Sequence, residues 1–292
     1  MKEHCYIVAG HCFSVLAAEG VDLSEELAQY APFVADAALA PQRVFRLQVV
    51  PEASLRQPDG LTQEFTQDDD GSQIRLFRTA DGASWFEFCL FDVLSGWMLA
   101  EPDFRNATLA IRKFSSFALS NALMVMFAMA TASLGTALFH AAVIGYEGRG
   151  YLFLGKSGTG KSTHARLWLK HVPGSELVND DNPVVRVFPD GSVLVYGSPW
   201  SGKTPCYRNM DLPLGGFVQL AQAPYNDIRR LKGVPAYAAL VPSISGKRWD
   251  RRIADGLHET ENTLASRVPV WHLDCLPDEA AALLCSETVT KA

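Results

Sequence analysis

Residues 152–168, LFLGKSGTGKSTHARLW, decide how the second half of this 292-residue chain folds. The apolar run 151–154 precedes a glycine-rich octet, and a helix-forming segment follows it. The octet, Gly155–Ser162, fits the phosphate-binding pattern G-x-x-x-x-G-K-[ST] in full. A strand before the pattern and a helix from Lys161 to about His171 after it are the context in which this pattern binds a nucleotide. We therefore expect a nucleotide site here.

Each type of residue in the octet suits a phosphate chain. The glycines allow backbone turns that direct successive N–H groups toward an anion. Lys161 supplies a cation for the terminal phosphates, and the Ser162 hydroxyl suits Mg²⁺. The helix that begins there points its positive end at the same phosphates. The predicted nucleotide-binding residues are Gly155, Lys156, Ser157, Gly158, Thr159, Gly160, Lys161, Ser162 and Thr163.

Two adjacent carboxylates, Asp180 and Asp181, end the short apolar strand predicted at 176–180. Because neighbouring residues of a strand point to opposite sides, one can serve a metal while the other faces the attacking group. The same Asn-Asp-Asp-Asn-Pro letters are also ordinary turn formers, which is the structural alternative. His140, on the preceding apolar strand, is expected either in the core or beside this pair, where an imidazole can tune a base.

A second conspicuous segment is YGSPWSGKTPCYRN, residues 196–209. We expect an exposed Trp200 there. The loop either brings Lys203 to the transferring phosphate or shapes an acceptor pocket around Trp200. A tight surface loop is the alternative. Arg229 and Arg230, in 223–231, are read either as an anion site or as the solvated face of a helix.

Composition indicates a folded globular protein rather than a polyanion binder. The formal net charge is −6 and no basic run occurs, so nucleic acid is not an expected partner. Six cysteines without a C-x-x-C pair suggest neither zinc nor a redox motif, and favour a reduced, cytoplasmic setting. No secretory signal is evident in the first residues. Polar residues interrupt the apolar stretch 117–145, so we predict a buried helix and strand there and no membrane contact.

The chain reads as a strand-rich α+β domain, 1–105, which is a candidate for substrate selection, followed by the nucleotide domain, 106–292. The strands, helices and loop predicted in the first part and at the boundary are strands at 5–10 and 44–50, a hairpin in 73–91 about Asp81-Gly82, a helix at 23–33 capped by Ser24, a polar loop at 56–73 and a long helix at 107–132.

The second half alternates strands and helices. Further predicted elements are strands at 140–146, 151–155, 214–223 and 268–274, a hairpin in 184–197 about Pro189-Asp190-Gly191, and helices at 234–240 and 277–285.

These motifs resemble the catalytic domain of HPr kinase/phosphorylase, whose nucleotide fold is shared with phosphoenolpyruvate carboxykinase. The resemblance covers 137–243 and rests on LFHAAVIG (138–145), LGKSGTGKST (154–163) and LVNDD (177–181). The segments 196–209 and 213–231 are similar to small bacterial HPr-kinase-like proteins.

The resemblance implies an α/β (α+β) P-loop domain of the carboxykinase type, with Mg-ATP as donor. It implies that one of Asp180 and Asp181 is the base and the other serves Mg²⁺, with His140 near the base. Thr163 stands where those kinases carry Glu, so HPr itself is not the expected acceptor.

We therefore predict a cytoplasmic phosphotransferase that moves the γ-phosphoryl group of ATP to a hydroxyl of a protein, a peptide or a small molecule, Ser being favoured. Two alternatives remain: a nucleotide-dependent switch without catalysis, and a tailoring kinase of a ribosomally made peptide. GTP and pyrophosphate remain open as donors, and a homo-oligomer remains open as the assembly.

Overall fold

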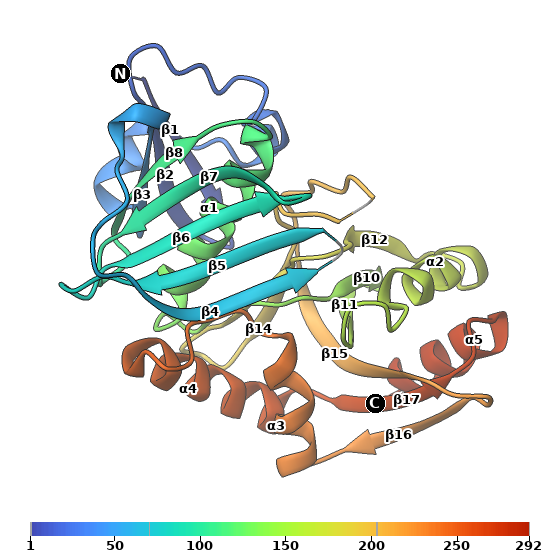
Figure 1. The fold of residues 1–292 in the computed structure, drawn as a ribbon. Coiled ribbons are helices and arrows are strands. Elements are labelled where there is room, and N and C mark those ends of the chain that lie inside the picture. Colours follow the sequence, from blue (N-terminus) through green and yellow to red (C-terminus); the bar gives the residue numbers. More distant parts are fainter. Residues whose placement is uncertain (1, 70, 203, 292) are drawn as a thin grey trace. The chain divides into compact units, whose positions relative to one another are not determined.

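The computed structural model describes residues 2–69, 71–202 and 204–291, and the chain forms two units, Met1–Thr131 and Ala132–Ala292 (Figure 1). Each unit combines helices with a mixed sheet, so the chain is an α/β protein of the α+β kind. The division lies later than the 105/106 boundary predicted from the sequence. Each unit is described below by itself.

The first unit is built on an eight-stranded sheet in the order β1-β2-β3-β8-β7-β6-β5-β4. The pairs β2–β3 and β3–β8 are parallel, and the other neighbouring pairs in this order are antiparallel. The strands are β1 (Lys2–Val8), β2 (His11–Ala17), β3 (Phe45–Pro51), β4 (Thr62–Asp69), β5 (Ser72–Arg78), β6 (Ser84–Leu90), β7 (Val93–Ala100) and β8 (Asn106–Ile111). The helices are α1 (Ser115–Thr131) and the short 3-10 helices η1 (Ala28–Phe33), η2 (Ala37–Gln42) and η3 (Glu52–Ser54).

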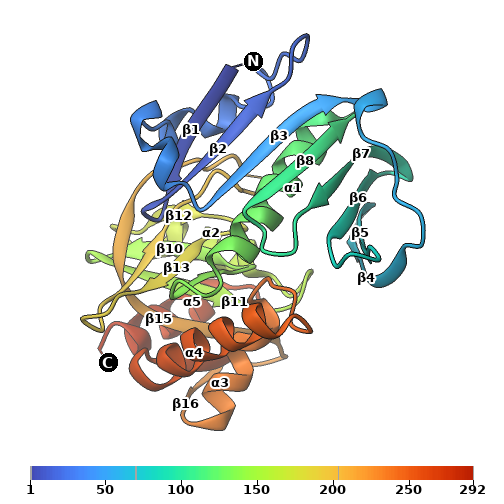
Figure 2. The same cartoon turned by 90° about the vertical axis from the view of Figure 1, so that its left-hand side faces the viewer.

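Helix α1 covers one face of this sheet, against β7 and β8 (Figure 2). The sequence of β3 alternates as a half-covered strand should, with Phe45 buried and its neighbour Arg46 only partly buried. The Phe45 ring stacks on Phe13 of β2 at a centroid distance of 4.9 Å, and Phe127 of α1 meets Phe13 edge-on. These aromatic contacts join the helix to the sheet.

Residues 106–131 explain the shift of the boundary. The sequence predicted one helix over 107–132, but Asn106–Ile111 is strand β8 and only Ser115–Thr131 is helical. Strand β8 pairs with β3 and β7, and α1 packs on the same sheet. Tertiary pairing therefore overrides the helical reading of this apolar stretch and ties it to the first unit.

Two other expectations in the first unit are wrong. The predicted helix at 23–33 is a turn followed by the 3-10 helix η1, which contains Pro32, and Ser24 bonds the Asp22 carboxylate instead of capping a helix. The predicted loop at 56–73 contains the edge strand β4, which pairs with β5. Its residues are largely exposed, so no apolar alternation marks it in the sequence. The strands predicted at 5–10 and 44–50 and the hairpin about Asp81-Gly82 are confirmed.

The second unit holds a nine-stranded sheet. Its main order is β12-β10-β11-β15-β14-β13-β9, with β17 beside β15 and β16 beside β17. The strands are β9 (Thr136–Leu138), β10 (Ala142–Tyr146), β11 (Arg149–Leu154), β12 (Glu176–Asn179), β13 (Val184–Val187), β14 (Val193–Tyr196), β15 (Asp211–Gln222), β16 (Asp227–Leu231) and β17 (Val270–Cys275). The helices are α2 (Lys161–His171), α3 (Val234–Leu240), α4 (Arg251–Arg267), α5 (Glu279–Val289) and the 3-10 helix η4 (Val241–Ser243).

Helices α2 and α5 pack together over one face of the second sheet. Trp168 of α2 and Cys285 of α5 are fully buried against Phe153, Val218 and Leu220 of the sheet. All the strands and helices predicted in this half are confirmed, with ends shifted by a few residues. The elements that were not predicted are the short β9 and η4, the helix α4, and β16, where the sequence was read as an anion site or a helix face.

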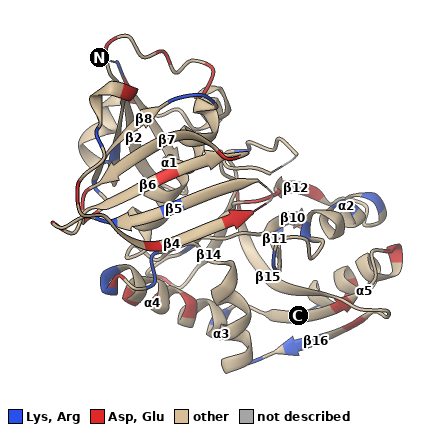
Figure 3. Ribbon diagram, viewed as in Figure 1, with Lys and Arg blue, Asp and Glu red and all other residues tan. Residues whose placement is uncertain are grey.

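Charged residues of both signs are interspersed along the ribbon of each unit in the view of Figure 3, in keeping with the modest net charge of −6. All six cysteines are free thiols. Over the part of the chain that the structure describes, no helix combines the length and apolar character that a bilayer crossing requires.

Candidate active site

The glycine-rich loop joins β11 to α2, and its backbone explains its composition. Gly155, Gly158 and Gly160 have φ angles of 153°, 78° and 107°, all in the region that disfavours residues with a Cβ. Gly160 is the N-cap residue of α2 in the left-handed conformation. The three glycines therefore turn the chain from the end of a strand into the first turn of a helix.

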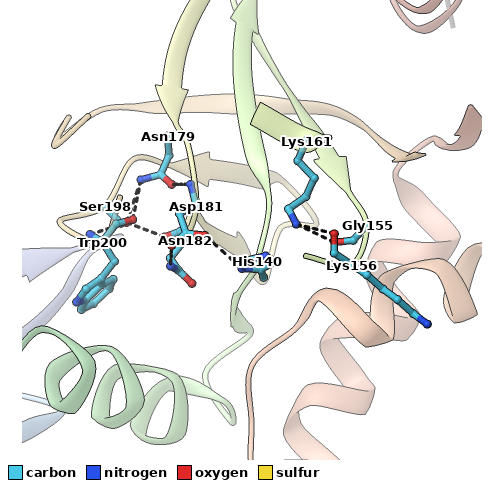
Figure 4. Close-up of polar contacts among 9 residues, drawn as sticks. All are labelled: His140, Gly155, Lys156, Lys161, Asn179, Asp181, Asn182, Ser198 and Trp200. Atoms are coloured by element: carbon cyan, nitrogen blue, oxygen red, sulfur yellow. Dashed lines mark hydrogen bonds and ion pairs between the residues drawn. The ribbon is translucent and has the colours of Figure 1, made fainter. Parts of the chain in front are cut away.

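Lys161, the first residue of α2, folds back over this loop and is only 8% exposed. Its Nζ donates to the carbonyl oxygens of Gly155 and Lys156 at 2.9 and 3.3 Å (Figure 4). From the other side, Gln222 at the end of β15 donates to the carbonyl oxygens of Gly158 and Thr159 at 3.2 and 3.4 Å. Side chains from two elements thus hold the loop.

Helix α2 is fixed behind the loop by a buried histidine. His164 lies edge-on to Phe153 at a centroid distance of 4.7 Å, and its Nε2 accepts the indole N–H of Trp168 at 3.2 Å. Burial lowers the pKa of His164 from 6.5 to about 4. The ring is therefore neutral at physiological pH, as its acceptor role requires.

Strand pairing brings two other segments to the same edge of the sheet as the loop. Strand β10 is antiparallel to β11, with Ala142 opposite Phe153, so β10 begins where β11 ends. Strand β12 is antiparallel to β10, with Asn179 opposite Val143, so β12 ends at that edge too. Two strand spacings separate β12 from β11, which is about 10 Å.

Asp181 follows β12 and is held on both carboxylate oxygens. His140 Nδ1 lies 3.2 Å from Oδ1, and Asn182 Nδ2 donates to Oδ2 at 2.7 Å (Figure 4). The backbones are joined as well, because Ala141 N donates to Asp181 O at 2.9 Å and Asp181 N donates to the Asn179 side-chain oxygen at 2.9 Å. Both side chains of the His140–Asp181 pair stay about one-third exposed, so a ligand can reach them.

Asp180 has a different environment from Asp181. Asp180 is 7% exposed, whereas the Asp181 side chain is 31% exposed. Strand β12 ends at Asn179, so both aspartates follow the strand instead of ending it as predicted. Burial raises the pKa of the neighbouring Cys206 thiol, which therefore stays protonated near neutral pH.

The residues fit Mg²⁺ as an oxygen-donor set but not as a complete protein cage. Ser162 supplies a hydroxyl and Asp180 and Asp181 supply carboxylates. No group of three or more His, Cys, Asp or Glu side chains arranged to hold a metal occurs among the described residues. Mg²⁺ commonly takes one or two carboxylates together with water and substrate phosphates, so this small donor set suits it.

The segment 196–209 braces the carboxylate strand instead of presenting an aromatic surface. Trp200 is 2% exposed, contrary to the expectation from sequence. Ser198 Oγ donates to the Asn182 carbonyl oxygen at 2.6 Å, and Asn179 Nδ2 donates to Ser198 Oγ and to the Trp200 carbonyl oxygen. Lys203, the predicted catalytic cation of this segment, lies outside the described residues.

Three site residues were missed from the sequence. Asn179, Asn182 and Ser198 form the hydrogen-bond network beneath Asp181. Asn179 and Asn182 were read only as turn formers, although their position on either side of the two aspartates in the sequence was a signal for such a network. Arg229 does not lie on a helix: it is in β16, where it bonds Asp274 at 2.7 Å and, ahead of other causes, holds the pKa of that carboxyl below its usual value.

The scan against protein-family models and the search of curated proteins returned no match. A search of solved structures returned the HPr(Ser) kinase/phosphatase from Coxiella burnetii, at 16% identity and a TM-score of 0.27, over 53% of this chain and 88% of that chain. That protein is a kinase/phosphatase by its description. At this TM-score we base no functional conclusion on the likeness.

Proposed function

We propose that this protein is a Mg-ATP-dependent phosphotransferase that moves the γ-phosphoryl group of ATP to a hydroxyl, a Ser of a protein or peptide being the favoured acceptor. The single observation that carries the proposal is the meeting at one sheet edge of the Gly155–Ser162 loop and the His140–Asp181 pair. Phosphoryl transfer requires a loop that binds the phosphates and, near it, an accessible carboxylate that can act as the base. Here the strands that carry the two are separated by two strand spacings.

The loop and the start of α2 would hold the phosphates. The amides of 155–160, the Lys161 ammonium and the positive end of α2 would stabilise the charge of the transferring group. Ser162 and the buried Asp180 would hold Mg²⁺, which supplies charge neutralisation when bound. In this assignment Lys161 exchanges its carbonyl partners for phosphate oxygens.

Asp181 is the proposed base. Its carboxylate would take the proton of the acceptor hydroxyl while the acceptor oxygen bonds to phosphorus and the bond to the ADP oxygen breaks. His140 on Oδ1 and Asn182 on Oδ2 would fix the orientation of the carboxylate. Exposure supports this choice over Asp180, because a base must reach its substrate.

The test is transfer of labelled γ-phosphate from Mg-ATP into a cell lysate, with ATP affinity measured in parallel. Asp181→Asn should reduce transfer about 10²- to 10⁴-fold and leave ATP affinity within about twofold. Lys161→Ala should lose both phosphate transfer and ATP binding. Asp255→Asn is the matched control, since Asp255 is an exposed residue of α4 that pairs with Arg251.

Full transfer by Asp181→Asn would refute the base assignment. Lys161-dependent ATP binding without any transfer would favour the nucleotide-dependent switch instead. Transfer that survives EDTA would refute the role of Mg²⁺.

A further inference from the structure

The sheet edge continues beyond the glycine-rich loop on the side away from Asp181. Strand β15 is parallel to β11 and β17 is parallel to β15, so all three end at this edge. After Gln222 the chain makes the short turn 223–226 and returns as β16 (Figure 1). This turn contains Tyr225, an aromatic side chain that is 56% exposed.

Hydrogen bonds hold the turn on both sides. Gln222, just before it, bonds the glycine-rich loop at the Gly158 and Thr159 carbonyls. On the other side Asn226 Oδ1 accepts the Leu276 N–H at 2.8 Å, and Asn226 Nδ2 donates to Asp278 at 3.0 Å. The position of Tyr225 is therefore defined relative to the phosphate loop, although its ring is open to solvent.

The proposed reaction gives the bound nucleotide a direction. His140 and Asp181 lie on the β10 and β12 side of the loop, so the γ-phosphoryl group must point that way. The nucleoside end must then extend toward the opposite side, where β15 and β17 end. Tyr225 is the exposed aromatic residue of the turn on that side.

We propose that Tyr225 forms one wall of a purine-binding subsite and stacks on the base of the nucleotide. This inference rests on the proposed function. An aromatic ring with a free face gains stacking energy from a nucleobase without needing to read its edges. The subsite would therefore accept adenine and guanine, and would leave the choice between them to other contacts.

The experiment compares ligands with and without a base on the full-length protein. Mg²⁺ complexes of ATP, GTP and tripolyphosphate are titrated by calorimetry against wild type, Tyr225→Ala, Tyr225→Phe and Lys161→Ala. Tyr225→Ala should weaken ATP and GTP about tenfold, which corresponds to about 1.4 kcal/mol, and leave tripolyphosphate within about twofold. Tyr225→Phe should bind all three like wild type. Phe114→Ala, at an exposed aromatic residue of the first unit, is the matched control.

The outcomes separate the two proposals. Wild type that binds none of the three ligands, or Lys161→Ala that binds them equally well, would refute the proposed function. Lys161-dependent binding that Tyr225→Ala leaves unchanged would refute the base subsite alone. An equal loss of tripolyphosphate and ATP in Tyr225→Ala would also refute it, because the residue would then act through the loop and not on the base.

Discussion

Acidification should destabilise the unit Ala132–Ala292 through His164, the neutral histidine behind the glycine-rich loop. Burial lowers its pKa from 6.5 to about 4. Between these values the unfolded chain binds a proton that the folded unit does not, so stability is complete above the unfolded pKa and is lost as the pH falls toward 4. The shift predicts a loss on the order of 2 kcal/mol between pH 7.5 and 5, approaching ~3 kcal/mol at pH 4.

The assay is hydrogen exchange of β11 and α2 in the full chain at pH 7.5 and 5, with the intrinsic exchange rates corrected for pH. His164→Gln offers an uncharged acceptor to Trp168, so this variant should lose about 2 kcal/mol less than wild type over the interval. His171→Gln, on the same helix beside Glu279, should keep the wild-type loss because His164 is intact. An equal loss in wild type and His164→Gln would refute the reasoning.

Three further predictions follow from other contacts. Asn182→Ala should lower kcat about tenfold with the KM for ATP and the Tm unchanged, because only the orientation of Asp181 is lost; a change in KM without kcat would contradict this. Arg248→Met should lower the free energy of unfolding, measured in urea, by about 3 kcal/mol, because it leaves the fully buried Glu261 carboxylate without its cation. Arg248→Met combined with Glu261→Leu should lower it clearly less, and an equal loss in the two variants would exclude the ion pair as the cause. Gly256→Ala should lower stability by about 1 to 3 kcal/mol by thermal unfolding despite the better helix propensity of Ala, because its Cβ would lie 2.6 Å from a backbone oxygen; an unchanged or raised Tm would refute the clash.

Much of the unit Ala132–Ala292 could be predicted element by element because its signals are local. The apolar run before Gly155 is a buried strand, and the helix after it has the predicted ends, Lys161 and His171. The hairpin about Pro189-Asp190-Gly191 also carries its turn residues in sequence, with Gly191 at a φ of 87°. Such segments need little information from the rest of the chain.

The missed strands β4 and β8 are strands because of their partners in the sheet. Strand β4 is polar on both faces and is a strand because β5 pairs with it. Strand β8 was read as helix because its apolar residues continue into those of α1. Helix α4 differs, because its signal is local: Asp250 caps it, and its buried residues Ile253, Leu257 and Leu264 recur at helical spacing. For β4 and β8 the deciding term is a tertiary contact that propensity does not contain.

The candidate site divides in the same way. The Gly155–Ser162 pattern is contiguous in the sequence, so the sequence alone predicted the loop between a strand and a helix. The meeting of His140 with Asp181 follows only from the pairing of β10 with β12. Asn179 bonds Ser198 next to the His140–Asp181 pair, and the hairpin β13–β14 separates these two residues in the sequence. No local sequence pattern predicts this hydrogen bond.

An irregularity in β12 sets which residue lies opposite Asp181. Ile144 is opposite Leu177 and Val143 is opposite Asn179, so Val178 is an extra residue in β12 at this point. A bulge of this kind reverses the faces of the residues that follow it, because side chains alternate along a strand. The carbonyl oxygens of the bulge are taken by the 196–209 segment: Arg208 donates to Leu177 O at 2.7 Å, and the Cys206 thiol lies 3.5 Å from Val178 O.

The 196–209 segment therefore acts on the site through the backbone of β12. Without the extra residue, the pairing of Ile144 with Leu177 would continue to place Val178 opposite Val143 and Asp181 opposite His140. With it, Asp181 is opposite Ala141, whose N–H donates to the Asp181 carbonyl oxygen at 2.9 Å. The bonds from Arg208 and Cys206 stabilise the bulged register, and the Ser198 bond to the Asn182 carbonyl fixes the chain on the other side of the two aspartates. The contact between His140 and Asp181 is therefore made by side chains that are offset by one residue across the two segments, and the bulged register helps to set its geometry. Two adjacent aspartates in a sequence do not reveal this offset.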